Sequence, residues 1–364
     1  MQNLRIPGPT PCPQDVLKAM SWPMINHRGP EFCQLLSKVT KDLKKMFVTN
    51  NDVLLLTCSG TGGMEAAVVN TLSPGDKVLA ISIGAFGDRF AEIAGLFGAE
   101  VIPLNFEWGK AADIDSINKA LKDNPGIKAV LVTHNETSTG VTNDLESISS
   151  VVKSYEKLLL VDAVSSLSSI KLPVDEWQCD VTVTGSQKGW MVPPGLAMVS
   201  VSREAWDAHA KAKMPRLYWD FTRAKNLLEK GQTPWTPAIS VIFALSVSLE
   251  KMVKEGLDNI IIKHKRIAQK TRKGIKELGL SLFADEKYAS NTVTAVAAPD
   301  GLDVKELLGI LRGDYNIILG GGQRHLAGKI FRIGHLGWVS EDDIDNVLAA
   351  LKEALPKAGF KGNK

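Results

Sequence analysis

The sequence predicts an α/β protein with a large, mostly parallel seven-stranded sheet and a smaller C-terminal α+β domain. Seven short apolar runs occur between residues 53 and 201, with helical stretches between most of them. These runs are continuously apolar, which is typical of strands that helices cover on both faces. Beyond residue 236 the pattern changes to long helices and then further strands. At 364 residues the chain also exceeds the usual size of one core.

The elements of the large domain follow in order. Prolines in 7–11 predict an extended segment, and an amphipathic helix fits 31–47. Helices are also predicted at 86–97 and 145–155. The seven predicted strands are 53–56, 77–81, 101–104, 128–132, 158–161, 181–184 and 196–201.

The smaller domain is predicted from a different pattern. Its helices are expected at 238–255, 257–278, 304–312 and 341–355, and its strands at 291–297, 317–320 and 329–333. Ser340 precedes an acidic run and is typical of a helix N-cap. We therefore expect an extended segment over 1–15, a large domain over 16–250 and a small domain over 251–364.

The composition argues against several classes of protein. A net charge of +3 without a basic run does not indicate nucleic-acid binding, and no run of about 18 apolar residues predicts a membrane span. The four cysteines form no Cys-x-x-Cys pair, and the histidines lack metal-ligand spacing, so no metal site is expected. Scattered cysteines and the absence of a signal-like N-terminus favour a cytoplasmic protein.

Lys188 and Asp162 are the first candidates for chemistry. Asp162 ends an apolar strand, where ligands bind in open α/β sheets, and Lys188 follows a small polar turn after a later strand. A desolvated lysine amine can form a Schiff base with the aldehyde of pyridoxal phosphate (PLP). An aspartate can keep the pyridine nitrogen of that cofactor protonated. Each residue alone also fits a structural role, as a surface lysine or a helix cap.

Two further features are compatible with a ligand site. The turn from Ser59 through Gly60 and Thr61 to Gly63 follows a strand and opens a helix, so its backbone N–H groups can bind an anion. It lacks the P-loop lysine and the third glycine of the dinucleotide fingerprint, and a plain tight turn remains an alternative. Arg332, between apolar residues of a strand, is either a charge on a rim or a clamp for a substrate carboxylate.

In combination these features resemble the class V aminotransferases of PLP fold type I, closest to the alanine–glyoxylate and serine–pyruvate group. The resemblance extends from Pro7 to the last helix. It is carried by five motifs: Ser-Gly-Thr-Gly-Gly-Met-Glu-Ala-Ala at 59–67, Gly-Ala-Phe-Gly-Asp-Arg at 84–89, Thr-His-Asn-Glu-Thr-Ser-Thr-Gly at 133–140, Val-Asp-Ala-Val-Ser-Ser at 161–166 and Gly-Ser-Gln-Lys at 185–188.

The resemblance implies PLP as the cofactor and a role for each matched residue. Lys188 matches the Schiff-base lysine, Asp162 the partner of the pyridine nitrogen, and Arg332 the arginine that binds the substrate α-carboxylate. The remaining matches bind the cofactor: Ser59, Gly60, Thr61 and Gln187 at the phosphate, Val164 and Phe86 on the two ring faces, and Thr137 at the 3′ edge. Phe86 is tryptophan in some members and Thr61 is histidine in some relatives.

The resemblance also implies a homodimer, in which Thr233 and Thr236 reach the phosphate of the neighbouring subunit. The implied reaction moves an amino group from alanine or serine to glyoxylate or pyruvate in ping-pong fashion. Arg28 is a candidate for a second carboxylate site, which would favour aspartate, although a structural role for it is favoured. A cysteine desulfurase is disfavoured because no cysteine follows Cys179. A non-enzymatic PLP-binding protein and a nicotinamide-dependent oxidoreductase are weaker alternatives.

Overall fold

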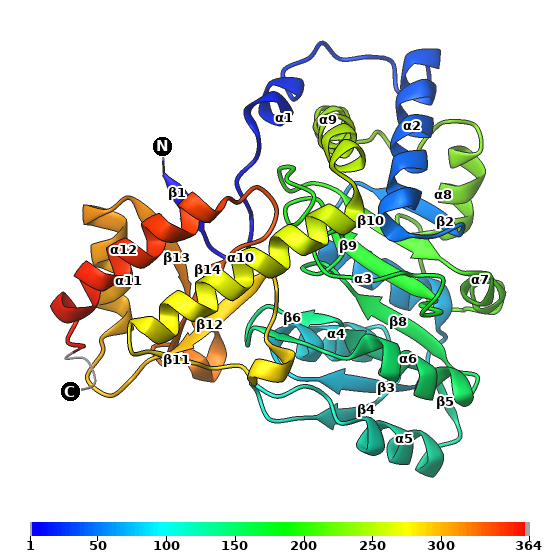
Figure 1. Ribbon diagram of the computed structural model, residues 1–364. Coiled ribbons are helices and arrows are strands. Elements are labelled where there is room, and N and C mark those ends of the chain that lie inside the picture. The colour runs from blue at the N-terminus through cyan, green and yellow to red at the C-terminus, as the bar shows by residue number, and fades with distance from the viewer. Residues whose placement is uncertain (1, 361–364) are drawn as a thin grey trace.

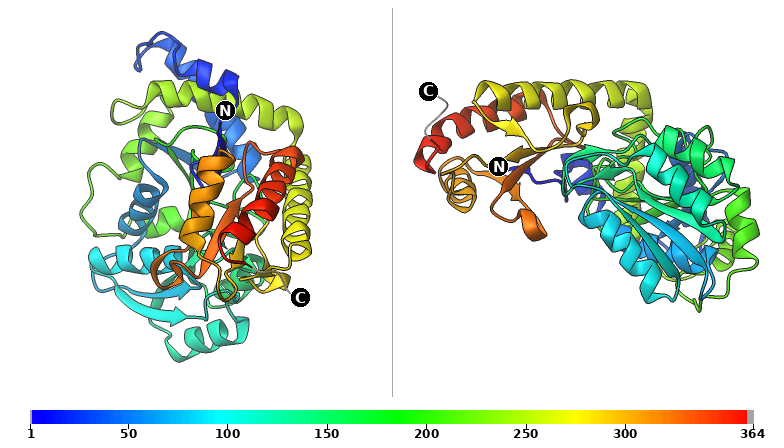
Figure 2. Two further views of the ribbon diagram at one scale, coloured as in Figure 1. Left: turned by 90° about the vertical axis from the view of Figure 1, so that its left-hand side faces the viewer. Right: turned by 90° about the horizontal axis from the view of Figure 1, so that it is seen from below.

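A computed structural model describes residues 2–360 and arranges them as a large α/β domain and a smaller α+β domain (Figure 1). The long helix α10 (Leu257–Glu277) runs along both domains (Figure 2). Ile260 of this helix packs in the core of the large domain, whereas Ile267 and Ile275 pack in the core of the small domain. Helix α10 therefore ties the two domains together as one continuous element.

The large domain contains the predicted seven-stranded sheet, with strand order β2-β10-β9-β8-β5-β3-β4. Within the described residues, β10 is antiparallel to β2 and β9, and every other pairing in the sheet is parallel. The fold-class prediction is thus confirmed. The strands are β2 (Asp52–Leu56), β3 (Lys77–Ser82), β4 (Glu100–Asn105), β5 (Ile127–Thr133), β8 (Leu158–Asp162), β9 (Val181–Gly185) and β10 (Ala197–Val201).

Helices cover both faces of this sheet, which explains why its strands are apolar on both sides. Alternate residues point to opposite faces of a strand, and Leu55 and Leu54 accordingly belong to different cores. One face packs against α1 (Gln14–Ala19), α2 (Pro30–Phe47), α5 (Ile114–Asp123), α6 (Leu145–Ser154) and α9 (Ile239–Glu255). The other packs against α3 (Gly60–Thr71), α4 (Ala85–Leu96), α7 (Arg203–His209) and α8 (Phe221–Leu228).

The small domain is built on a five-stranded sheet of order β1-β13-β14-β12-β11. Helix α12 (Glu341–Lys357) begins with a capping box: the Ser340 side chain accepts from the Asp343 N–H, and the Asp343 carboxylate accepts from the Ser340 N–H. This confirms the predicted N-cap. The remaining elements are β11 (Ser281–Leu282), η1 (Glu286–Tyr288), β12 (Val293–Ala297), α11 (Val304–Asp314), β13 (Ile317–Gly321), η2 (Arg324–Leu326) and β14 (Ile330–Gly334). The short hairpin of β6 (Asn135–Glu136) and β7 (Val141–Thr142) stands apart from both sheets.

The N-terminal segment belongs to both domains. Strand β1 (Asn3–Arg5) pairs in parallel with β13, so it forms the edge of the small-domain sheet. The chain then crosses to the large domain, where the Thr10 N–H donates to the Gln187 carbonyl at 3.0 Å. The sequence predicted an extended segment here but no strand and no partner. Among residues 2–360, no helix combines the length and the apolar character needed to cross a bilayer.

Candidate active site

The site lies at the carboxyl ends of two parallel neighbours in the large sheet. Asp162 is the last residue of β8, and Lys188 follows β9 by three positions. Because β8 and β9 run in parallel, these ends meet at one edge of the sheet. Asp162 is 3% exposed and Lys188 is 9% exposed. The sheet topology therefore brings the two predicted catalytic residues to the same edge.

The N-terminal segment covers the Lys188 amine. Its Nζ donates a hydrogen bond of 2.6 Å to the Pro7 carbonyl, and the Lys188 carbonyl accepts from Thr10 Oγ1 at 3.0 Å. Burial lowers the pKa of Lys188 to about 8; the charge of Asp162 opposes this shift and that of Arg332 adds to it. The amine is therefore easier to deprotonate than that of an exposed lysine.

Asp162 is a buried carboxylate with a fixed orientation. Its Oδ1 accepts from the Val164 N–H at 2.9 Å. Burial raises the pKa of Asp162 to about 6, while the Val164 N–H and the charge of Lys188 act in the opposite direction. The group is thus ionised at neutral pH and can face a positive charge in the site.

The glycine-rich turn adjoins the lysine turn. Ser59 caps α3 by accepting from the Gly62 N–H at 3.4 Å. A Cβ on Gly60 would lie 2.6 Å from Val164 Cγ2, and a Cβ on Gly185 would lie 3.5 Å from the Gly60 nitrogen. Gly60 therefore lets the turn approach Val164 closely, whereas a Cβ on Gly185 would make only an ordinary contact with Gly60. Thr61, partly buried, occupies the first turn of α3.

Arg332 reaches into the same region from the small domain. It lies on β14 and is 6% exposed, so it is a buried side chain and not a charge on a rim. Its Nε donates to the Gly321 carbonyl at 2.9 Å, and its Nη1 donates to the Thr137 carbonyl at 3.0 Å. These two bonds fix the plane of the guanidinium group beside Thr137.

Two residues without a predicted role hold Phe86 in place. The Phe86 N–H donates to Glu136 Oε2 at 3.1 Å, and the Arg89 guanidinium carbon lies 4.8 Å from the centre of the Phe86 ring. Glu136 is fully buried, and burial raises its pKa while hydrogen bonds from Ser138 lower it. The role of Glu136 was not evident from the sequence, because Glu136 and Phe86 are 50 positions apart, whereas Arg89 lies three positions after Phe86 on α4, a spacing that places both on one helix face.

Thr233 and Thr236 lie on a different loop. Thr233 Oγ1 donates to the Trp235 carbonyl at 2.8 Å, and Thr236 is exposed. Arg28 Nη1 donates to the Thr233 carbonyl at 2.7 Å, and its guanidinium also bonds Gln232 and Pro234. Within the described part of one chain, no hydrogen bond joins this loop to Lys188, Asp162 or Arg332. Arg28 thus braces the loop that carries Thr233.

The residues at this edge fit PLP. Gln187 Oε1 is buried and has no hydrogen-bond partner among residues 2–360, and turning this amide over would present its Nε2 donor to a phosphate instead. Gly60 leaves room against Val164 that a Cβ would fill. Gly8 has a φ of +124°, and a Cβ there would lie 2.4 Å from Lys188 Nζ. The chemistry of these residues suits a phosphate at the helix start beside Gly60 and an aldehyde at the Lys188 amine.

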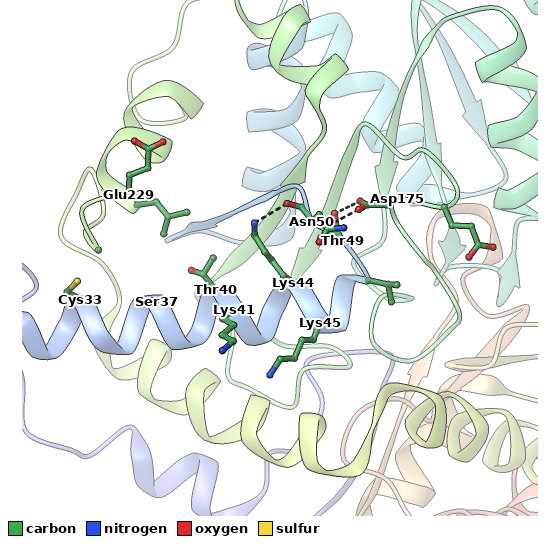
Figure 3. A pocket seen from close by; sticks show the side chains of 14 residues that line it. Cys33, Ser37, Thr40, Lys41, Lys44, Lys45, Thr49, Asn50, Asp175 and Glu229 are labelled. Atoms are coloured by element: carbon green, nitrogen blue, oxygen red, sulfur yellow. Dashed lines mark hydrogen bonds between the residues drawn. The ribbon is translucent and has the colours of Figure 1, made fainter.

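A cavity outside this site lies in the large domain. It measures about 1070 Å³ and lies between α2, the turn at Asp175 and the end of α8 (Figure 3). Several residues that line this cavity form hydrogen bonds with one another: Lys44 Nζ donates to the Asn50 carbonyl, and Asp175 accepts from Thr49 and Asn50. It contains none of the residues predicted to bind cofactor or substrate.

The fold and the site together define a PLP-dependent enzyme of fold type I. Residues 3–344 match the family model described as Aminotransferase class-V, and the chain belongs to this family. It is therefore a PLP-dependent aminotransferase. This result removes the PLP-binding protein without activity and the nicotinamide-dependent oxidoreductase from consideration.

Individual relatives cover nearly the whole chain. The soluble hydrogenase 42 kDa subunit of Anabaena cylindrica is 45% identical, over 98% of this chain and 94% of that protein. The L-aspartate–glyoxylate aminotransferase of Paracoccus denitrificans is 39% identical, over 92% of this chain and 86% of that protein. The crystal structure of alanine–glyoxylate aminotransferase from Nostoc sp. superposes with a TM-score of 0.94 at 30% identity, over 97% and 95% of the two chains.

Proposed function

We propose that this aminotransferase moves the amino group of a small amino acid, alanine or serine, to glyoxylate or pyruvate by a ping-pong mechanism. The observation that carries the proposal is Arg332, a buried guanidinium beside Thr137 that suits one carboxylate. Arg28, the candidate for a second carboxylate, differs from Arg332 in being exposed, and its guanidinium bonds three consecutive residues of one loop, Gln232, Thr233 and Pro234. The two aminotransferases compared above have glyoxylate in their names, which supports it as the acceptor.

PLP, when bound, supplies an electrophilic aldehyde and an electron-accepting ring. In this proposal the neutral Lys188 Nζ takes the proton from the substrate Cα and would donate it to C4′, the former aldehyde carbon of the bound cofactor. Asp162 keeps its negative charge against the protonated ring nitrogen. Arg332 binds the substrate carboxylate and thereby orients the Cα–H bond toward Lys188.

The proposed cofactor contacts follow the site geometry. Residues of the glycine-rich turn at 59–63 and of the lysine turn at 185–188 hold the phosphate. Residues of other segments contact the cofactor ring. The phosphate contacts are Ser59, Gly60, Thr61 and Gln187, and the ring contacts are Val164, Phe86 and Thr137.

We further propose a cytoplasmic homodimer in which Thr233 and Thr236 complete the phosphate site of the partner. The exposed position of Thr236, away from the lysine of its own chain, supports this assignment. All four cysteines are free, as expected in a reducing compartment. The proposed division is an extended segment 1–15, a large PLP-binding domain 16–250 and a small domain 251–364. The helical chain is interrupted at Gly256, between α9 and α10, a few residues beyond the proposed boundary.

The test uses a Lys188→Ala variant and a panel of donors. We expect the variant to lose turnover and the visible absorbance of the lysine-bound cofactor, whereas Lys110→Ala, at an exposed lysine paired with Glu107, keeps both. Retention of either property by Lys188→Ala would contradict the assignment. Steady-state rates with glyoxylate and pyruvate should be highest with alanine or serine. Aspartate is the main alternative donor because of the Paracoccus relative, and a strong preference for it would reject the small-donor proposal.

A further inference from the structure

A buried chain of hydrogen bonds links Thr137 to the small domain. Thr137 Oγ1 donates to Ser165 Oγ at 2.8 Å, and Asn135 Nδ2 donates to the same oxygen at 2.8 Å. Asn135 Nδ2 also donates to Thr292 Oγ1 at 3.0 Å. None of these four side chains is more than 6% exposed. Water cannot replace bonds at such depth, so each bond of the chain matters for the position of its neighbours.

Because the Ser165 hydroxyl has a single proton, it determines which groups donate and which accept in this series of hydrogen bonds. Ser165 Oγ has one proton, which it donates to the Asn135 carbonyl at 2.9 Å, because a carbonyl can only accept. Ser165 must therefore accept from both Asn135 and Thr137. The proton of Thr137 is committed to Ser165, and the lone pairs of Thr137 Oγ1 remain available as acceptors.

A second connection runs from the same residue to the same domain. Arg332 Nη1 donates to the Thr137 carbonyl. Thr292 directly precedes β12, the strand that pairs with β14 and places Ala295 opposite Arg332. The His335 N–H donates to the Thr292 carbonyl at 2.9 Å and extends this pairing. Thr137 is thus held by its side chain and by its carbonyl to two adjacent strands of one sheet.

We propose that Asn135 and Thr292 are positioning residues that fix Thr137, and the cofactor edge it contacts, relative to Arg332. The proposal rests on the cofactor and substrate roles given above to Thr137 and Arg332. Asn135 suits this task because all of its polar groups are used: Oδ1 accepts from Thr142 Oγ1 at 2.7 Å, and Nδ2 serves Ser165 and Thr292. Neither Asn135 nor Thr292 is placed in contact with cofactor or substrate.

The test compares Thr292→Val with Thr292→Ser. The valine variant keeps the volume and removes the hydroxyl, and the serine variant keeps the hydroxyl. For Thr292→Val we expect the KM for the oxo acid and the Kd for PLP to rise roughly three- to tenfold, because the variant loses the bond from Asn135 Nδ2 and the 3.1 Å bond with Ser290 Oγ. The serine variant should stay close to wild type. Thr271→Val is the matched control, because Thr271 is fully buried and its hydroxyl bonds only the Ile267 carbonyl of its own helix.

A double-mutant cycle adds a readout that a packing effect would not produce. Since Thr292 acts through Asn135, adding Thr292→Val to Asn135→Ala should change the KM and the Kd less than twofold further. Equal effects of Thr292→Val and Thr271→Val, or full additivity in the cycle, would overturn the proposal. If the Thr292→Val variant does not fold, the Thr292→Ala variant is compared with the Thr292→Ser variant instead.

The binding of PLP to the full-length apoprotein separates this proposal from the proposed function. Absence of transamination by the wild-type protein would reject the function and leave the comparison of PLP affinities intact. Normal transamination with unchanged PLP affinity and KM in Thr292→Val would reject the positioning role alone.

Discussion

Lys188 and Asp162 are buried next to each other with opposite effects of burial on their pKa values. Burial lowers the pKa of Lys188 to about 8 and raises that of Asp162 to about 6. Desolvation disfavours the charged form of each group, and their mutual attraction offsets only part of this effect. The site thus maintains a lysine that is readily deprotonated beside a carboxylate that is still ionised at neutral pH.

The uptake of PLP by the apoprotein should therefore depend on pH around 8. Only the neutral amine attacks an aldehyde, and a group with a pKa of about 8 becomes neutral as the pH rises through that value. We expect the rate of formation of the visible absorbance to increase from pH 6.5 to 9 with a midpoint of about 8. Stopped-flow absorbance at a series of pH values measures it. A rate that keeps rising tenfold per pH unit to about pH 10, as for an ordinary lysine, would contradict the lowered pKa.

At this scale the sequence located residue types and not their partners. Asp162 ends an apolar strand, Lys188 follows one, and Arg332 is a charged residue within one. These positions made the three residues candidates. Ser165 and Glu136 were not given roles, because their hydrogen bonds reach segments far away along the chain. The Pro7 carbonyl that accepts from Lys188 belongs to the backbone and leaves no side-chain signal.

At the scale of elements, the strands of the large sheet were located to within a few residues. Their apolar runs are continuous because two sets of helices bury both faces. Strand β1 was not predicted, because three residues with no alternating pattern carry no signal without their partner β13. The reversed direction of β10 was not predicted either, since an apolar run does not record its direction.

The segment after β1 makes a testable contact with the active site. Gly8 has a φ of +124°, and a Cβ there would lie 2.4 Å from Lys188 Nζ. Gly8→Ala should therefore displace the lysine side chain and slow PLP uptake at least about tenfold, the equivalent of about 1.4 kcal/mol. The visible absorbance after addition of PLP measures this effect.

Gly328→Ala is the control for backbone strain. Gly328 also has a positive φ, +74°, but a Cβ there would meet no atom within 4 Å. Both variants should lose stability, Gly8→Ala more than Gly328→Ala because a φ of +124° is further from the left-handed region that alanine can adopt, and only Gly8→Ala should bind PLP slowly. Normal uptake by a folded Gly8→Ala protein would show that the segment does not confine Lys188.

At the scale of the whole molecule, the small domain also contacts the large one beside Phe86. Arg324 Nη1 lies 2.5 Å from Asp88 Oδ2, and the rings of His325 and Trp108 lie 4.2 Å apart. Arg324 follows β13 closely, and the β13 residue Gly321 provides the carbonyl that binds Arg332 Nε. The ion pair therefore fixes the segment whose carbonyl orients Arg332, the proposed substrate-binding arginine.

Arg324→Ala should weaken substrate binding without unfolding the protein. An ion pair with a half-exposed arginine contributes up to about 1 kcal/mol, so we expect the KM for the amino acid to rise by roughly two- to fivefold. Lys77→Ala is the matched control, because it removes an exposed pair with Glu100 inside the large domain. Steady-state kinetics measure the KM, and a melting curve should show nearly equal Tm values. An unchanged KM in Arg324→Ala would argue against this fastening role.

The pairing of β1 with β13 also sets an order for assembly during translation. Asn3 to Arg5 leave the ribosome long before their partners Ile317 to Leu319. Until those partners emerge, the edge position of β1 cannot be filled, and the Pro7 carbonyl is not held over Lys188. The nascent large domain can thus complete its sheet while its lysine is still uncovered. The cover over the active-site amine becomes one of the last parts of the molecule to form.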